Sequence, residues 1–260
     1  MIETPQITPD LDLEKYFTDV GLGELVAPSK ARDQSVNELV IADTYKPELK
    51  DLYRLHRFIL DFKRTTVLEF GVGWSTLVMA NALAINRGKY HRAVANLRRN
   101  NPFEIHAVDN ERNYLEVAKA RISATRLAGV HFHCSTVEMT TFNGRIATQF
   151  AKLPLISPDF IYLDGPDQFN VQGSINGINT AHNDMMPMAC DLLRFEHFLT
   201  PGTIIVVDGR GANARFLRCN FQRGWTYNYE ERYDQHVFYL DEPPLGEYNK
   251  RQLNFYSSKT

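Results

Sequence analysis

VLEFGVGWST, residues 67–76, combines a short apolar run, a glycine turn and the start of a helix. The apolar run carries Glu69, the turn carries Gly71 and Gly73, and the helical pattern begins at Trp74. Glycines allow the backbone to turn sharply and approach a ligand, and a helix N-terminus presents free N–H groups. This stretch therefore predicts a strand, a ligand-binding turn and a helix in succession.

Four more short apolar runs occur along the chain, and amphipathic helical patterns separate them. The five predicted strands cover residues 66–70, 104–108, 130–134, 159–163 and 203–207. The helices between them are predicted to begin near Trp74, Asn110, Arg145 and Asp184. Strands that alternate with helices indicate an α/β fold with a parallel sheet and helical crossovers.

The two ends of the chain follow other patterns. Residues 1–64 contain short amphipathic pieces and one clear helix that opens at Pro47, which predicts a helical N-terminal cap before a domain covering 65–260. The aromatic-rich stretch GWTYNYEERYDQHVFYL, residues 224–240, predicts a terminal hairpin that is antiparallel in part. Residues 165–183 lack a confident element and are a candidate active-site loop or lid.

The amino-acid composition limits the kinds of molecule that the protein is expected to bind. The 260 residues are 43% hydrophobic and carry 29 Lys+Arg against 31 Asp+Glu, so the basic excess that duplex nucleic acid requires is absent. Three widely spaced cysteines form no CxxC motif, and the sequence shows neither an apolar leader nor a run long enough for a membrane helix. We expect a soluble, cytoplasmic protein that acts on a small molecule, and the sequence leaves homo-oligomerisation open.

The second predicted strand ends at Asp109, 38 residues after Gly71. A carboxylate at this position can accept paired hydrogen bonds from the vicinal hydroxyls of a ribose. The alternative is that Asp109 only caps the helix that begins at Asn110. A dinucleotide-binding fingerprint is not met, because Thr76 stands where a third glycine is required and the usual acid about 20 residues later is missing.

Four motifs in order, LEFGVG (68–73), AVDN (107–110), FIYLDGPD (160–167) and LTPGTIIVVDG (199–209), resemble the class I S-adenosylmethionine-dependent methyltransferase family over about residues 66–240. The resemblance implies a Rossmann-like, seven-stranded, mostly parallel sheet with helices on both faces and a reversed last hairpin. It implies that the methionine part of S-adenosylmethionine is held by Glu69, Gly71, Gly73, Trp74, Ser75 and Thr76. Asp109, with Asn110 beside it, would hold the ribose, and the adenine would be flanked by Ser135, Thr136 and Val137.

Two later strands end at Asp164 and Asp208, on the edge where open α/β sheets bind ligands. In the catechol-type, caffeoyl-coenzyme-A-type and macrolide-sugar O-methyltransferases, which this part resembles, the matching aspartates hold a divalent metal with help from an Asn or Asp directly after the second. Here Gly209 follows, so a site for Mg²⁺ or Mn²⁺ would need a replacement ligand. The loop offers Asp167, Asn170, His182 and Asp184. Alternatively, the two aspartates cap their turns.

The sequence therefore predicts a methyltransferase that O-methylates a small sugar-like or phenolic acceptor, and it leaves an anionic acceptor open. Asp164, Asp208 and His182 are the candidates for the base that removes the hydroxyl proton. A nucleotide-binding oxidoreductase and a non-catalytic cofactor-binding or assembly subunit are the alternatives. His131 and His133 alternate within one predicted strand, and without visible carboxylate or cysteine partners they are interpreted as ordinary polar residues.

Overall fold

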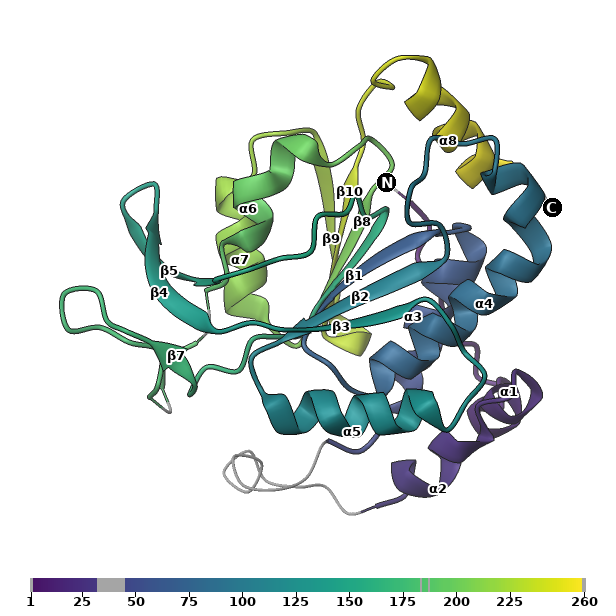
Figure 1. Cartoon of the computed structure of the whole chain (residues 1–260), viewed down its shortest axis with the longest axis horizontal. Coiled ribbons are helices and arrows are strands. Elements are labelled where there is room, and N and C mark those ends of the chain that lie inside the picture. The colour runs from purple at the N-terminus through teal and green to yellow at the C-terminus, as the bar shows by residue number, and fades with distance from the viewer. Residues whose placement is uncertain (1, 32–44, 183, 187, 259–260) are drawn as a thin grey trace.

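A computed structural model of the chain describes residues 2–31, 45–182, 184–186 and 188–258. Its centre is a seven-stranded sheet in the order β3-β2-β1-β6-β8-β10-β9 (Figure 1). All neighbouring pairs are parallel except those made by β10, which runs antiparallel to β8 and β9. The strands are β1 (Thr66–Phe70), β2 (Glu104–Asp109), β3 (Val130–Cys134), β6 (Phe160–Leu163), β8 (Ile204–Asp208), β9 (Trp225–Glu230) and β10 (Gln235–Leu240).

This arrangement confirms the predicted sheet. Each of the five predicted parallel strands is present with its ends within one residue of the expected ones, and the aromatic stretch forms the reversed hairpin β9–β10. The central strands β1, β6 and β8 were predictable because both of their faces are covered, so each of these strands is a nearly continuous apolar run.

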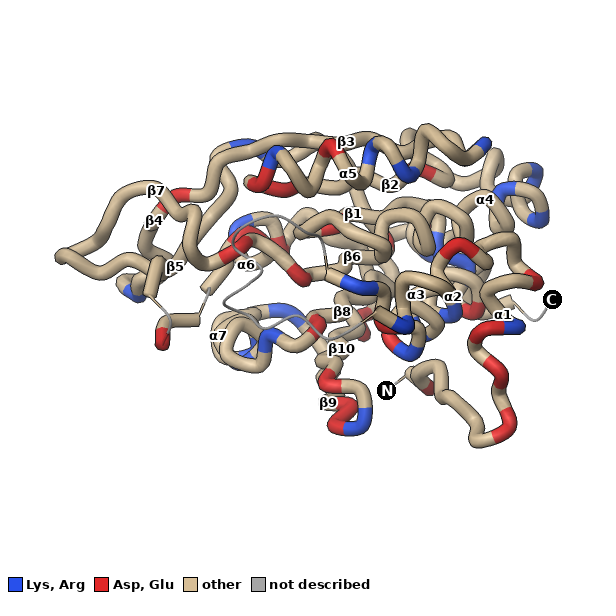
Figure 2. Tube along the Cα trace, turned by 90° about the horizontal axis from the view of Figure 1, so that it is seen from below, with Lys and Arg blue, Asp and Glu red and all other residues tan. Residues whose placement is uncertain are grey.

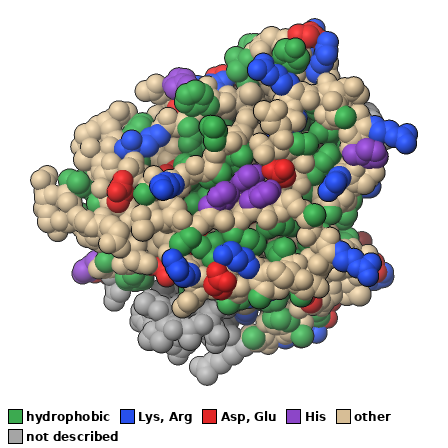
Figure 3. Space-filling view, viewed as in Figure 1, with side chains coloured by type: hydrophobic (Ala, Val, Ile, Leu, Met, Phe, Trp, Pro, Cys, Tyr) green, Lys and Arg blue, Asp and Glu red, His purple; other side chains and the backbone are tan. Residues whose placement is uncertain are grey.

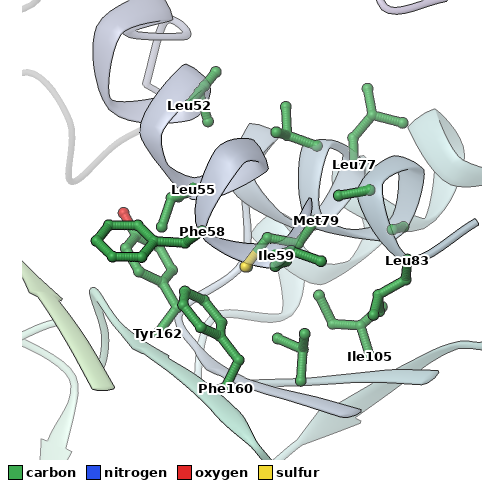
Figure 4. Packing of buried hydrophobic residues seen from close by; sticks show 14 of the residues in the cluster. Leu52, Leu55, Phe58, Ile59, Leu77, Met79, Leu83, Ile105, Phe160 and Tyr162 are labelled. Carbon is green, nitrogen blue, oxygen red and sulfur yellow. The ribbon is translucent and has the colours of Figure 1, made fainter. Parts of the chain in front are cut away.

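Helices lie on both faces of the sheet, as expected, because alternate strand residues point to opposite sides. One face packs against α3 (Leu49–Asp61) and α4 (Trp74–Val94), and α5 (Arg112–Ser123) lies over β2 and β3. Figure 4 shows Phe58 and Ile59 of α3 next to Phe160 and Tyr162 of β6. The other face packs against α6 (Asp191–Phe195) and α7 (Gly211–Asn220).

One predicted helix is wrong. Residues from Arg145 form the strand β5 (Arg145–Phe150), which pairs antiparallel with β4 (Val137–Phe142). Asn143 and Gly144 connect the two strands with positive φ angles of 49° and 74°, the conformation that tight hairpin turns require. With β7 (Val171–Gln172), which lies within the predicted loop 165–183, the hairpin builds a separate three-stranded sheet.

Two predicted helix starts are also corrected. The helix expected near Asp184 begins at Asp191, because the segment before it is held extended beside β5: Ala189 bridges to Thr148, and the side chain of Asn213 bonds both backbone groups of Ala189. The helix expected to begin near Asn110 begins at Arg112 instead. The strand β2 extends to Asp109, whose carboxylate accepts the N–H of Glu111.

The chain ends pack onto this framework. Helices α1 (Leu13–Asp19) and α2 (Val26–Ser29) precede α3, and α8 (Glu247–Ser257), which the sequence did not predict, follows the last strand. Because α3 shares its apolar cluster with β1 and β6, it covers the sheet directly, and the domain boundary at 64/65 stays a prediction. Figure 2 shows acidic and basic residues interspersed along the trace. Within the described residues, no helix is both long and apolar enough to cross a membrane.

Candidate active site

The carboxyl ends of β1, β2, β6 and β8 meet at one edge of the sheet, and the predicted site residues follow these ends. At β1, Gly71 has a φ of +89°, and its backbone touches that of Gly165 after β6. A Cβ atom on Gly165 would lie 2.5 Å from the Gly71 nitrogen, so neither position has room for a side chain. The Asp164 N–H donates to the Phe70 carbonyl at 2.9 Å. This contact fixes Asp164 beside the glycine turn.

Glu69 supports the turn from inside. Its side chain is fully buried, and its two oxygens accept hydrogen bonds from Ser75 Oγ at 2.5 Å and Thr76 Oγ1 at 2.6 Å. Burial raises the pKa of Glu69 to about 8, against the opposing effect of the two hydroxyls. These three side chains are engaged with one another, so their structural task is to hold the glycine turn against the start of α4.

Asp109 joins the ends of β1 and β2. Its side chain is 4% exposed, Oδ2 accepts the Val72 N–H at 2.8 Å and Oδ1 accepts the Glu111 N–H at 2.7 Å. Burial raises its pKa to about 6, although the backbone N–H groups lower it. Beside it, Asn110 Nδ2 donates to the Asn170 carbonyl at 3.2 Å, whereas the buried Asn110 Oδ1 has no hydrogen-bond partner among the described residues. The unpaired acceptor Asn110 Oδ1 therefore lies next to Asp109, the residue predicted to bind the ribose.

The remaining residues predicted to bind the cofactor differ in the burial and the contacts of their side chains. Val137 is fully buried in the core, and Ser135 Oγ accepts the Lys152 N–H at 2.9 Å. Thr136 between them is exposed. The indole ring of Trp74 packs against the core and lies under the Arg121 guanidinium, whose Cζ is 3.7 Å from the ring centroid. Of these side chains, Thr136 is the most exposed and Trp74 is partly exposed.

Asp164 and Asp208 follow neighbouring strands, since Leu163 pairs with Val207 in the parallel ladder of β6 and β8. Asp208 Oδ2 accepts the Tyr162 hydroxyl at 2.6 Å. Arg210 approaches Asp164, with Nε 3.8 Å from Oδ1, and its Nη2 donates to the Pro166 carbonyl at 2.8 Å. The structure thus brings both aspartates to the predicted edge and adds a tyrosine and an arginine.

Both aspartates titrate above their ordinary range. Burial raises the pKa of Asp208, whereas the Tyr162 hydrogen bond lowers it. Protein atoms crowd the Asp164 carboxylate even though 54% of its side-chain surface is exposed. This crowding raises the pKa of Asp164, Arg210 opposes the increase, and the charges of Asp208 and Asp109 add to it. Asp51 of α3 joins the group, because burial and Asp208 raise its pKa to about 7. The edge is therefore rich in carboxylates that repel one another.

The donor set does not fit a divalent metal. Gly209 supplies no ligand, the Arg210 guanidinium lies against Asp164, and Tyr162 bonds one oxygen of Asp208. Within the described ranges, the sole cluster of three potential metal-binding side chains is elsewhere, at Glu104, His106 and His131. A hard cation would need about six oxygen ligands, some of them from water.

The loop residues do not replace the missing ligand. Asp167 Oδ2 accepts the N–H groups of Phe169 and Asn170, so it closes a local turn. His182 is 65% exposed and lies 4.0 Å from Asp184, and no hydrogen bond or ion pair connects it to Asp164 or Asp208 in the described part of the chain. The structure does not bring His182 into the acid pair.

Among the side chains of this edge, the sequence did not single out Asp51 or Tyr162. Tyr162 stands two residues before Asp164, so the alternation of a strand was a signal that it lies near the same edge. The position of Asp51 depends on how α3 crosses the sheet, for which the sequence gives no local signal.

Comparisons with known proteins give structural matches of low sequence identity. No family model and no curated protein matches the sequence. The chain is similar to the O-methyltransferase TomG from Streptomyces achromogenes, solved with SAM (14% identity, 90% of this chain and 100% of that chain, TM-score 0.44). It is also similar to an O-methyltransferase from Bacillus cereus in complex with SAH (12%, 88% and 97%, 0.44) and to CalS11, a TDP-rhamnose 3'-O-methyltransferase (14%, 94% and 98%, 0.44).

Proposed function

We propose that this chain is an S-adenosylmethionine-dependent methyltransferase that methylates a hydroxyl oxygen of a small sugar-like or phenolic acceptor. One observation carries the proposal: the glycine turn, Asp109 and the pair Asp164–Asp208 meet at one carboxyl edge of a seven-stranded sheet. Open α/β sheets bind their ligands at this edge.

The residues of the edge fit the cofactor. Asp109 and the unpaired Asn110 Oδ1 offer acceptors for ribose hydroxyls, and the glycine turn leaves the backbone open to close approach. The crowded carboxylates favour a positively charged ligand, because a nearby cation relieves their repulsion. Bound S-adenosylmethionine would supply a positively charged sulfonium and its electrophilic methyl group.

The acid pair provides the proton acceptor. A carboxylate with a raised pKa is a better base near neutral pH than an ordinary one. Asp208 is the stronger candidate for the base, because the hydrogen bond from the Tyr162 hydroxyl orients its carboxylate. Asp164 lies beside it. In the transfer, the Asp208 carboxylate would take the proton of the acceptor hydroxyl, and bound S-adenosylmethionine would supply the methyl group to the acceptor oxygen and keep the electron pair of the carbon–sulfur bond.

Arg210 gives the acceptor site its anionic preference. Its buried Nη1 has no hydrogen-bond partner among the described residues, while Nη2 is fixed by the Pro166 carbonyl. A guanidinium with an unused N–H suits a phosphate, a carboxylate or a sugar hydroxyl. We place the enzyme in the cytoplasm on the basis of its three free cysteines.

The test is transfer of a labelled methyl group from S-adenosylmethionine to a panel of phenols, sugars and nucleotide sugars, with and without a chelator. We expect labelled product with at least one hydroxylated acceptor, undiminished by the chelator. Asp208→Asn should abolish turnover while S-adenosylhomocysteine still binds. Binding of a nicotinamide dinucleotide in place of S-adenosylhomocysteine would contradict the proposal in favour of an oxidoreductase. Cofactor binding without transfer to any acceptor would favour a non-catalytic subunit.

A further inference from the structure

A cluster of one carboxylate and three imidazoles lies on β2 and β3, away from the active edge. Glu104 and His106 alternate on β2, and His131 and His133 alternate on β3. His106 pairs directly with His131 in the parallel ladder. Because side chains two residues apart share a face of a strand, all four lie on the same side of the sheet.

In the described part of the chain, no helix between β3 and β6 covers this face. A right-handed connection from β3 back to β6 would place a helix over this side, opposite α4 and α5. The chain forms the β4–β5 hairpin instead, which belongs to the second sheet. Figure 3 shows histidine side chains gathered beside an acidic one in the middle of the exposed face. His131 is 45% exposed and Glu104 27%, so solutes reach the cluster.

The donor atoms are close enough to share one ion. Glu104 Oε2 lies 3.1 Å from His106 Nε2 and 3.5 Å from His131 Nε2, and the three ligand atoms are all within 4.8 Å of one another. In a tetrahedral zinc site with bonds of 2.0–2.2 Å, neighbouring ligand atoms are roughly 3.3 Å apart. The rings of His106 and His131 are stacked, with centroids 4.5 Å apart.

The protonation states also suit a metal. Burial opposes ionisation of Glu104, but hydrogen bonds from Asn101 and His106 lower its pKa. Burial lowers the pKa values of His106 and His133. The lowered pKa values favour the ionised form of Glu104 and the neutral form of His106, which are the forms that bind metals.

We propose that Glu104, His106 and His131 bind one divalent transition-metal ion of the zinc class, with His133 in the outer shell. His106 Nδ1 is 3.1 Å from His133 Nε2, so His133 can fix the tautomer of His106 that directs Nε2 at the ion. Three protein ligands leave a fourth position for water or another small ligand.

The site is separate from methyl transfer. Glu104 begins β2 and Asp109 ends it, which places them about 16 Å apart at the rise of an extended strand. An ion bound here would connect β2 to the edge strand β3 and stabilise the folded chain, since the unfolded chain does not hold the ligands together.

The test is a competition titration of Zn²⁺ and Co²⁺ against a chromogenic chelator, on untagged protein freed of metal. We expect one ion per chain, and His131→Ala or Glu104→Gln should weaken binding at least about 100-fold. His133→Ala should weaken it about 10- to 100-fold. His91→Ala, at an exposed helical histidine, is the matched control and should bind as the wild type does.

Two further readouts distinguish this site from adventitious binding. Zn²⁺ should raise the melting temperature of the wild type and of His91→Ala but not of His131→Ala. Bound Co²⁺ should give a visible spectrum in the wild type but not in His131→Ala. Equal affinity in the wild type and in His131→Ala, or no binding in either, would overturn the site. Neither result bears on the proposed methyltransferase activity.

Discussion

Tyr162 determines how the proposed base titrates, because its hydroxyl hydrogen bonds to Asp208 Oδ2 at 2.6 Å. Burial raises the pKa of Tyr162 well above its ordinary value, so the phenol remains a donor. Donation to the ionised carboxylate lowers the pKa of Asp208, whereas burial raises it. Tyr162 is therefore a positioning residue whose removal should be visible in the pH dependence of activity.

Tyr162→Phe should shift the pH–rate profile toward higher pH. Activity that needs ionised Asp208 is present above its pKa and is lost as pH falls through it. A hydrogen bond to a charged group contributes about 1.5–3 kcal/mol, which corresponds to a shift of about 1 to 2 pH units. The measurement is kcat/KM from pH 5 to 9, with Tyr90→Phe as the control. An unchanged profile in a folded Tyr162→Phe variant would exclude this role.

The sequence identified Asp109, Asp164 and Asp208 as candidate site residues because each stands at the end of an apolar strand. It did not identify Asp51, whose position depends on tertiary packing. The histidines of β3 were interpreted as ordinary because their partners, Glu104 and His106, lie 25 or more residues earlier in the sequence. Local pattern cannot reveal a contact that only the register of two strands creates.

The glycine turn and the strand end after β6 act as one element, since Gly71 and Gly165 pack backbone to backbone. Gly165→Ala should destabilise the fold by about 1–3 kcal/mol, the usual cost of overpacking. Gly88→Ala is the control, because Gly88 is helical with open space around it, and alanine there should stabilise by up to about 1 kcal/mol. Urea unfolding curves measure both. Equal stability of the Gly165→Ala variant and the wild type would contradict the close approach.

Helices and strands were predicted correctly where the hydrophobic pattern was strong, and the predictions were unreliable where that pattern was short. The Asn143–Gly144 pair was a usable hairpin signal between two alternating runs, yet the regular succession of strands and helices favoured a helix there. The extended segment before α6 could not be predicted, because the side chain of Asn213, 24 residues later than Ala189, holds it.

Asp159 connects several elements at the end of the sheet opposite the candidate active site. This fully enclosed carboxylate accepts the N–H groups of Thr65 and Thr66 and the Tyr256 hydroxyl of α8, and Arg99 lies 3.5 Å away. Burial opposes its charge, but Arg99 and Arg64 lower its pKa below the ordinary value. It links β1, β6 and the C-terminal helix.

Asp159→Asn should cost about 3–5 kcal/mol of unfolding free energy, because it leaves buried cations uncompensated. Since the folded pKa is depressed, the stabilisation is present above the unfolded pKa of about 3.9 and is lost as pH falls through the folded one. The difference from the wild type should therefore shrink below about pH 4 in chemical denaturation. Asp61→Asn, in a half-exposed pair with Arg57, should cost less than about 1 kcal/mol. If Asp159→Asn also costs less than about 1 kcal/mol of unfolding free energy, the contacts of Asp159 do not stabilise the fold as described.

The claim that the carboxyl edge binds S-adenosylmethionine is tested most directly by calorimetric titration of S-adenosylhomocysteine into the wild type and Asp109→Ala. We predict one ligand per chain for the wild type and a loss of about 1.5–3 kcal/mol of binding free energy in the variant, because hydrogen bonds to a charged group are removed. Asp191→Asn, at a buried carboxylate that likewise accepts a backbone N–H, should bind with unchanged affinity. No binding to the folded wild type, or equal affinity in Asp109→Ala, would contradict the account.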